Sequence, residues 1–235
     1  MILFDIDDTL IDHSKAEKTA SLSFGNQYRD DIPDYDPDGF SEKWRNEAEI
    51  HFQDFLSGKI SFKEQRRRRI RGVFDDHSLS DSQTDLIFED YLRFYEESWE
   101  LFPDVIPFLE SNAEEEFAVL SDGAQRQQEL KLQKTRILPL FNFVLTAEST
   151  GMSKPNPALF VKACEIADAD PSQTFYIGDN MQKDAIGAYQ AGLNGVWLNR
   201  NRTQTSYSIY TIDTLADFKP ADALQWTQTS RDIES

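Results

Sequence analysis

The sequence predicts an α/β fold, in which a parallel sheet carries helices on both faces and a helical module is inserted after the first strand. Short apolar runs alternate with helical patterns over much of the chain, which is typical of a parallel sheet. The stretch His13–Trp99 instead shows helical periodicity and no strand signal. At 235 residues and 39% hydrophobic content, the chain is long enough for a core domain and a smaller inserted one.

The expected strands are short, rich in β-branched, aromatic or leucine residues, and mostly followed by a turn signal. They are Ile2–Phe4, Phe117–Leu120, Phe143–Leu145, Thr174–Ile177 and Gly195–Leu198. One more strand is expected near Ser208–Ile212, and a loose tail after it.

Helical patterns lie between the consecutive strands from Phe117–Leu120 to Gly195–Leu198. They cover Ala124–Arg136, Pro157–Asp168 and Met181–Ala191. The middle one is the clearest, because Asn156 fits the N-cap position and Pro157 the first helical position.

Within the insert, Ser61 and Ser80 each stand three residues before a Glu or Gln, as in a capping box. Aromatic and aliphatic residues recur there at helical spacing, in two sets. The sets are Phe40, Trp44, Ala48, Phe52 and Phe55, then Ile87, Tyr91, Phe94 and Tyr95.

Composition excludes several classes of protein. The 42 acidic residues outnumber the 24 basic ones, and a net charge of −18 disfavours binding to nucleic acids and anionic membranes. The single cysteine, Cys164, allows no intrachain disulfide, and no Cys/His cluster has zinc spacing. No apolar run is long enough for a membrane span, and the first residues do not resemble a signal peptide. We therefore expect a cytoplasmic protein.

Polar side chains follow the expected core strands, and the carboxyl ends of parallel strands are where an open sheet binds ligands. They are Asp5, Asp7 and Asp8 after the first strand, Ser121 and Asp122 after the second, Lys154 after the third, and Asp179 and Asp184 after the fourth. So many acids cannot remain ionised together with one lysine as their only counter-charge. A hard divalent cation is expected, and Mg²⁺ suits a carboxylate site that also holds a phosphate.

Asp5-Ile-Asp7-Asp8-Thr9-Leu10 resembles the first motif of the haloacid dehalogenase superfamily of phosphatases. Ser121 resembles its second motif, Lys154-Pro155-Asn156-Pro157 its third, and Gly178-Asp179 with Asp184 its fourth. Four motifs in family order and spacing are a specific signal, whereas one DxD pair would be a weak one. The resemblance implies a Rossmann-like parallel sheet core of residues 1–12 and 100–235, with residues 13–99 as an inserted α-helical cap domain.

The resemblance also implies a role for each site residue. Asp5 would be the nucleophile that forms an aspartyl-phosphate, and Asp7 would protonate the leaving oxygen and then activate water. Ser121, Asp122 and Lys154 form the implied substrate-binding set, in which Ser121 and Lys154 would bind the phosphoryl group. Asp122 stands where the family often has Asn and adds an acid beside them. The implied metal set is Asp5, Asp7 through its backbone carbonyl, Asp179, and Asp184, which would orient the waters of the metal or Lys154.

Some of these residues also have ordinary structural interpretations. Asp8 fits a turn, and Asp184 could simply complement a helix dipole. The run Arg66–Arg69 spreads around a helix, so we expect a solvated or salt-bridged helix there rather than a nucleic-acid surface. Trp44, with Phe52 and Phe55, is expected in the core of the insert.

The expected activity is hydrolysis of a small phosphorylated metabolite by a monomer or homodimer. Asp7 argues against a dehalogenase, because a carbon–halogen bond needs no such proton donor. A phosphosugar phosphatase, a phosphomutase, a phosphonatase using Lys15 or Lys18, and a non-catalytic binding protein remain open. The segment Asp7–His13 with Ala16-Glu17, and the ending Trp197-Leu198-Asn199, are similar to the nucleotide 5′-monophosphatase group of the superfamily. A nucleoside 5′-monophosphate is therefore the expected substrate.

Overall fold

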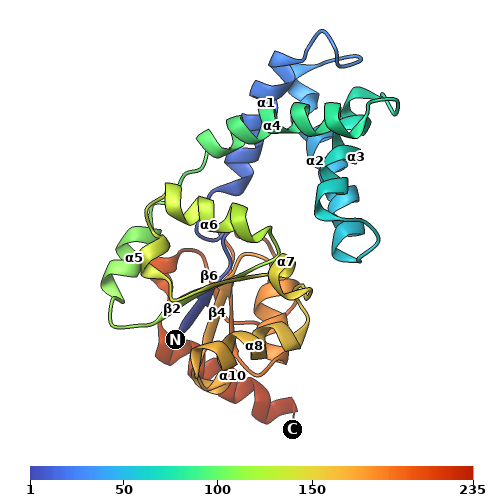
Figure 1. Cartoon of the computed structure of the whole chain (residues 1–235). Coiled ribbons are helices and arrows are strands. Elements are labelled where there is room, and N and C mark those ends of the chain that lie inside the picture. The colour runs from blue at the N-terminus through green and yellow to red at the C-terminus, as the bar shows by residue number, and fades with distance from the viewer. Residues whose placement is uncertain (235) are drawn as a thin grey trace. The chain divides into compact units, whose positions relative to one another are not determined.

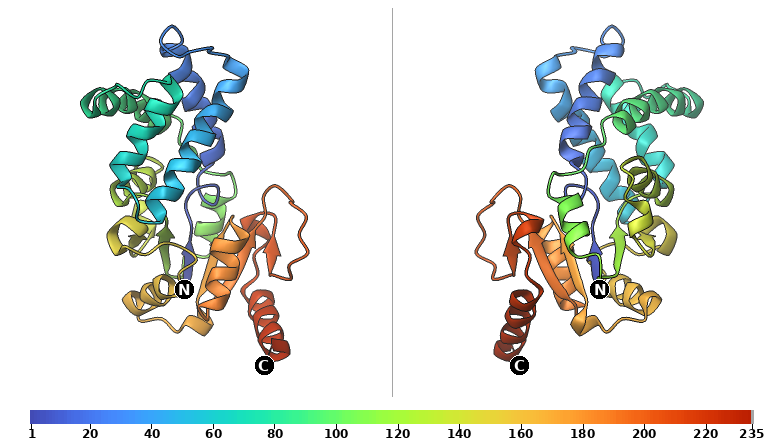
Figure 2. Two further views of the ribbon diagram at one scale, coloured as in Figure 1. Left: turned by 90° about the vertical axis from the view of Figure 1, so that its right-hand side faces the viewer. Right: turned by 90° about the vertical axis from the view of Figure 1, so that its left-hand side faces the viewer.

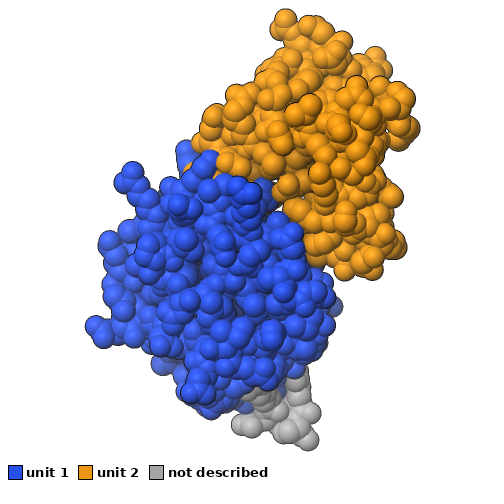
Figure 3. Space-filling model, viewed as in Figure 1, with its two compact units in different colours: residues 1–12, 100–235 blue, residues 13–99 orange. Residues whose placement is uncertain are grey.

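The computed structural model describes residues 1–234, and residues 1–230 with their side chains. The chain forms two compact units (Figure 3). Unit 1 comprises Met1–Asp12 and Glu100–Ser235, and unit 2 comprises His13–Trp99.

Unit 1 is built on a six-stranded sheet in which every neighbouring pair is parallel. The spatial order is β3-β2-β1-β4-β5-β6, so the chain order reverses at β1. The strands are β1 (Ile2–Phe4), β2 (Phe117–Ser121), β3 (Val144–Thr146), β4 (Phe175–Gly178), β5 (Asn194–Leu198) and β6 (Thr211–Ile212). This order is that of a Rossmann-like doubly wound sheet, which confirms the fold class predicted from the sequence.

Helices lie on both faces of this sheet (Figure 1). Those of unit 1 are α5 (Val105–Ser111), α6 (Gln125–Lys134), α7 (Ala147–Thr150), α8 (Pro157–Ala167), α9 (Gly187–Gln190) and α10 (Pro220–Glu234), with short 3₁₀ segments at Leu138–Leu140, Pro171–Gln173 and Leu215–Asp217 and a π-helical turn, η3, at Met181–Ile186. As expected, Asn156 caps α8 by accepting a hydrogen bond from the backbone N–H of Ala158.

The alternation of side chains along β1 divides the core between the two faces. Leu3 packs into a cluster with Leu159 and Phe160 of α8, whereas the ring of Phe4 lies 5.8 Å from the ring of Phe108 on α5. All of these side chains are at most 4% exposed, and burying each stabilises the fold by about 1.5–3 kcal/mol. The site-bearing strands are therefore held between two apolar layers.

The C-terminal part differs from the sequence prediction. The segment expected to be a loose tail forms helix α10, seen near the label C in Figure 2, and β6 is shorter than expected. Pro220 occupies the first helical position, Ala223 and Thr227 are buried, and the ring of Trp226 packs against Tyr189. The prediction was wrong because this helix buries a narrow stripe that includes a threonine, which weakens the apolar pattern.

Unit 2 contains four helices, α1 (His13–Gln27), α2 (Pro37–Leu56), α3 (Phe62–Phe74) and α4 (Asp81–Glu97). Trp44 is fully buried at their centre, and its ring centroid lies 4.9 Å from that of Phe24 and 4.3 Å from that of Tyr91.

The two expected capping boxes differ in the structure. Ser80 forms a complete capping box, whereas Ser61 accepts the N–H of Glu64 without the reciprocal bond. The Glu64 carboxylate instead accepts a hydrogen bond from Arg68.

The arginine run on α3 is engaged within unit 2. Arg66 lies over the Phe62 ring, Arg67 donates two hydrogen bonds to Asp85, and Arg68 pairs with Glu64. Arg69 is buried, pairs with Glu17 and lies over the Trp44 ring. The helix is thus salt-bridged, as expected from the sequence.

Within residues 1–234, no helix combines the length and apolar character needed to cross a membrane.

The two connections between the units run side by side at their unit 1 ends. Ile11 and Leu101 form an antiparallel bridge, and the N–H of Asp12 donates to the carbonyl of Glu100. Arg200 fixes the base of both connections, because it donates to the carbonyl of Thr9 and stacks on Phe102. Asp104 accepts two hydrogen bonds from the Arg200 guanidinium and a third from the backbone N–H of Leu215.

Candidate active site

The topology brings Asp5 and Asp179 to the point where the strand order reverses. Asp5 follows β1 directly, and Asp179 follows β4. Phe4 at the end of β1 pairs with Val119 of β2 on one side and Ile177 of β4 on the other. Crevices at the carboxyl ends of strands beside such a reversal are the usual ligand sites of open α/β sheets.

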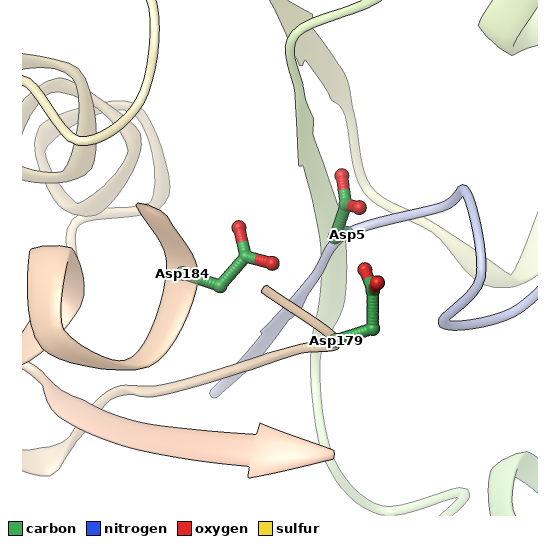
Figure 4. A group of neighbouring side chains, drawn as sticks. All are labelled: Asp5, Asp179 and Asp184. Atoms are coloured by element: carbon green, nitrogen blue, oxygen red, sulfur yellow. The ribbon is translucent and has the colours of Figure 1, made fainter. Parts of the chain in front are cut away.

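Asp5, Asp179 and Asp184 form one group of carboxylates (Figure 4). Each offers an oxygen, and these three atoms lie within 4.8 Å of one another. Asp184 reaches the group from the π-helical turn η3, and its side chain packs directly over Gly178. A larger residue at Gly178 would collide with this carboxylate, so the glycine makes the approach possible.

Burial and mutual repulsion raise the pKa of two of these acids. Burial, with the charges of Asp184 and Asp7, raises the pKa of Asp5 to about 7 despite the opposing charge of Lys154. Burial, with the charge of Asp5, raises the pKa of Asp179 to about 8. A hard cation would relieve this repulsion, and an all-carboxylate oxygen set fits Mg²⁺. The donor set therefore fits the metal that the sequence predicts.

Lys154 supplies positive charge to the group. Its ammonium donates to Asp5 at 2.8 Å, to Asp184 at 2.7 Å and to the Tyr176 hydroxyl at 3.0 Å. Burial lowers the pKa of Lys154, but the charges of Asp184 and Asp5 outweigh it and keep the pKa well above its usual value. The Tyr176 hydroxyl in turn donates to the carbonyl of Leu120 at 2.7 Å, so Lys154 is held from three sides.

Asp122 organises the loop that carries Lys154. One of its carboxylate oxygens accepts the backbone N–H of Lys154 at 2.9 Å, and the other lies 3.5 Å from the Lys183 ammonium. These contacts give the additional acid a structural use. Its role in substrate binding stays a prediction.

A second set of contacts surrounds Asp7 and Ser121. The Gln128 amide, from α6, donates to the Ser121 hydroxyl and to Asp7, each at 2.9 Å. Lys131, one turn further along α6, donates to the other carboxylate oxygen of Asp7 at 2.5 Å. Ser121 and Lys131 are both at most 2% exposed. The structure thus brings Asp7 and Ser121 together through α6.

Thr9 connects the first motif to the fourth. It is fully buried, and its hydroxyl accepts the backbone N–H of Asp179 at 3.0 Å. The Trp197 indole donates to the carbonyl of Asp179 at 2.8 Å, which fixes the same residue from β5. Asp8 adopts a left-handed conformation with φ of 56°, in keeping with the turn role expected for it.

Sequence reasoning missed Gln128, Lys131, Tyr176 and Arg200. Gln128 lies three residues before Lys131 and four before the buried Leu132, so helical spacing places all three on one inward face. Polar residues on a helix are ordinarily solvated, however, and nothing local distinguishes these two. Tyr176 lies within a strand that reads as apolar, and Arg200 lies in a polar loop.

The model of the haloacid dehalogenase-like hydrolases matches residues 1–192, about four-fifths of the chain. The chain belongs to this family of hydrolases. The match includes all four of the motifs identified above, and it confirms the resemblance on which the expected site was based.

Relatives within the family are similar over most of their length. The HAD-hydrolase YfnB of Bacillus subtilis is 28% identical over 84% of this chain and 83% of its own. A glyceraldehyde 3-phosphate phosphatase of Methanopyrus kandleri is 30% identical over 86% and 85%. The pyrimidine 5′-nucleotidase PynA of Streptococcus pneumoniae is 24% identical over 92% and 93%.

Solved structures agree with the fold. The crystal structure of YfnB with magnesium bound has a TM-score of 0.78 and 24% identity, and it covers 92% of this chain and 95% of that one. A 2-haloacid dehalogenase of Pseudomonas syringae has a TM-score of 0.70 at 23% identity, over 95% and 97%. At these identities the two structures support the fold alone.

Proposed function

We propose that this haloacid dehalogenase-like hydrolase is a Mg²⁺-dependent phosphatase that hydrolyses a small phosphate monoester through an aspartyl-phosphate on Asp5. The observation that carries the proposal is the group of three carboxylates within 4.8 Å at the carboxyl ends of β1 and β4, with the Lys154 ammonium hydrogen-bonded to two of them. Phosphatases among the relatives support it.

In the first step an oxygen of Asp5 attacks phosphorus, and the bond between phosphorus and the leaving oxygen breaks. That oxygen takes the proton carried by Asp7, so an alcohol departs. In the second step Asp7 takes a proton from water as the water oxygen attacks phosphorus. The bond from phosphorus to Asp5 then breaks, which releases inorganic phosphate and restores both acids. Ser121 and Lys154 bind the phosphoryl oxygens.

The carboxylates of Asp5 and Asp179 and the backbone carbonyl of Asp7 would hold the Mg²⁺, with Asp184 beside them. When bound, the ion supplies positive charge that shields the Asp5 carboxylate from the anionic phosphate. Asp184 keeps the lysine and the turn after β4 in place, since it contacts both Lys154 and the N–H of Asn180.

A nucleoside 5′-monophosphate is the substrate we favour, because a pyrimidine 5′-nucleotidase matches nearly the whole chain. A phosphorylated sugar or triose is the alternative, since the glyceraldehyde 3-phosphate phosphatase has the higher identity. All the site residues above address the phosphoryl group, which these substrates share. Unit 2 would therefore act as the cap domain that distinguishes the leaving groups.

The reaction can be tested with 4-nitrophenyl phosphate and Asp5→Asn. The amide is a poor nucleophile and carries no charge, so we expect turnover to fall by roughly a thousandfold or more. Asp8→Asn is a matched control, because asparagine also tolerates the left-handed backbone there, and it should stay within a few-fold of wild type. A folded Asp5→Asn protein with near wild-type turnover would exclude the mechanism.

The metal dependence and the substrate preference are tested in two separate experiments. A chelator should remove the activity and Mg²⁺ should restore it; full activity in chelator would remove the ion from the proposal. Phosphate release from a panel of nucleoside monophosphates and sugar phosphates, compared by kcat/KM, then decides between the two substrate classes.

A further inference from the structure

Both oxygens of the Asp7 carboxylate are contacted by side chains of one helix. Lys131 donates to Oδ1 and Gln128 donates to Oδ2. The two donors are three residues apart on α6, so they project from the same side of the helix. Their contacts fix the rotation of the Asp7 carboxyl group as well as its position, which a single hydrogen bond would not do.

Gln128 also ties this arrangement to the phosphoryl-binding Ser121. Its amide nitrogen donates to both residues, and its side chain packs so closely over Gly123 that any larger residue there would collide with it. The amide oxygen of Gln128 is buried and has no hydrogen-bond partner among the described residues. The amide nitrogen thus lies between Ser121 and Asp7 and links the two side chains.

Burying the charged side chain of Lys131 at this position is energetically unfavourable. The side chain is 2% exposed, whereas its partner Asp7 is 28% exposed. A buried ion pair is often no more stabilising than well-packed apolar residues of similar volume, because both charges must lose water. Stability alone gives little reason for a lysine here, and a positioning role accounts for it better.

We propose that Lys131 and Gln128 are positioning residues that orient the Asp7 carboxyl group for proton transfer to the leaving oxygen. The inference rests on the proposed function, since it requires Asp7 to be the proton donor and acceptor. Lys131 acts through Asp7, so its loss should affect the steps in which Asp7 takes part. Gln128 also contacts Ser121, so its loss would affect phosphoryl binding as well.

Leaving groups of different basicity distinguish this role from a structural one. A 4-nitrophenolate ion departs readily without a proton, whereas an alkoxide needs one. A misaligned Asp7 should therefore slow an alkyl phosphate much more than 4-nitrophenyl phosphate. A merely structural loss would instead slow both substrates alike.

The experiment measures kcat/KM, which reports the phosphoryl transfer from substrate, for Lys131→Met on 4-nitrophenyl phosphate, on phenyl phosphate and on an alkyl phosphate. We expect a loss within about threefold on the first and of at least about thirtyfold on the last, since a positioned acid is worth roughly 100- to 10,000-fold. Arg126→Met removes a charge from an exposed position of the same helix and should leave the three values unchanged. Equal losses of Lys131→Met on all three substrates would overturn the inference.

Asp7→Asn separates failure of the inference from failure of the proposed function. If this variant loses no more activity on the alkyl phosphate than on 4-nitrophenyl phosphate, Asp7 is not the proton donor, and the proposed mechanism fails together with the inference. If Asp7→Asn shows the dependence and Lys131→Met does not, only the inference fails.

A double variant provides a second measurement. If Lys131 acts through Asp7, adding Lys131→Met to Asp7→Asn should cost nothing further on the alkyl phosphate, because residues that work as a unit are non-additive. Additive losses would contradict the inference. Should Lys131→Met not fold, Lys131→Gln removes the same charge, and the same leaving-group comparison applies to it.

Discussion

Asp179 and Asp184 have different surroundings although both belong to the carboxylate group. Asp184 is fully buried, and its oxygens accept hydrogen bonds from Lys154 and from the N–H of Asn180. Asp179 is partly exposed, and two of its fixed contacts, with Thr9 and Trp197, are made through its backbone. The side chain of Asp179 is therefore the better placed to bind a metal. The side chain of Asp184 also holds Lys154 and the turn after β4 in place.

We predict that Asp179→Ala weakens Mg²⁺ binding more than Asp184→Ala, whereas Asp184→Ala lowers the stability of the protein more. Removing Asp184 leaves the buried Lys154 with one carboxylate fewer, and breaking a buried ion pair typically costs about 3–5 kcal/mol. Mg²⁺ titrations by calorimetry and denaturant melts of the two variants test both halves. Identical titration curves would contradict the ranking for the metal.

Among single residues, the sequence identified those that belong to a motif. It did not identify the residues that form hydrogen bonds with them. Asp5, Asp179 and Lys154 could be found because each directly follows a strand or precedes a helix in a recognisable pattern. Tyr176 could not be found in this way, because its contact with Lys154 joins residues 22 positions apart. Contacts of that kind depend on how strands pair, which no local pattern encodes.

Among the elements, helix α2 carries the fully buried Trp44 of unit 2. Trp44 lies at helical spacing with other aromatic residues, which predicts a core position, and it is fully buried. Its indole packs on Phe24, Tyr91 and the Arg69 guanidinium. A substitution there would disturb the whole of unit 2, and it would not report on substrate contacts alone.

We predict that Trp44→Ala destabilises unit 2 by about 3–5 kcal/mol, because it removes a large buried ring and leaves a cavity. Arg68→Ala is the comparison, since Arg68 is 43% exposed and its pairing with Glu64 is worth at most about 1 kcal/mol. Thermal and urea melts followed by tryptophan fluorescence and circular dichroism measure both. An unchanged melt of Trp44→Ala would mean that unit 2 repacks around the missing ring.

Helices were predicted best where the hydrophobic periodicity and the capping residues indicated the same boundaries. Helix α8 satisfied both criteria, since it has an N-cap, a proline at its first position and an apolar stripe. Helix α10 has a proline at its start but buries Thr227, and its polar composition resembles a disordered tail. Its existence depends on packing against β5 and Tyr189, which is tertiary information.

For the whole molecule, the raised acid pKa values couple stability to pH when no metal is bound. The pKa of Asp179 is about 8 in the folded chain, against a model-compound value of 3.8 that applies to the unfolded chain. Between these values the folded protein keeps a proton that the unfolded chain has released. The contribution of Asp179 to the free energy of unfolding therefore falls as pH rises from about 4 to about 8, and becomes level above that.

We predict that wild type in chelator loses stability relative to Asp179→Asn as the pH rises through this window. The variant is a matched control, because it keeps the size of the side chain and removes its titration. The difference between the two melting temperatures, measured from pH 5 to pH 9, should widen toward alkaline pH and narrow again with Mg²⁺. Parallel curves in chelator would contradict the pKa assigned to Asp179.

The paired connections at Ile11 and Leu101 have a consequence for how such a chain could arise and be altered. Because Asp12 and Glu100 are hydrogen-bonded neighbours, 87 residues enter and leave the sheet unit at one place. A short turn could join these two positions as in a β-hairpin, without moving any strand. An insertion, exchange or deletion of the helical segment would therefore change the chain at one place on the sheet unit, and the carboxylates after β1 and β4 would keep their positions.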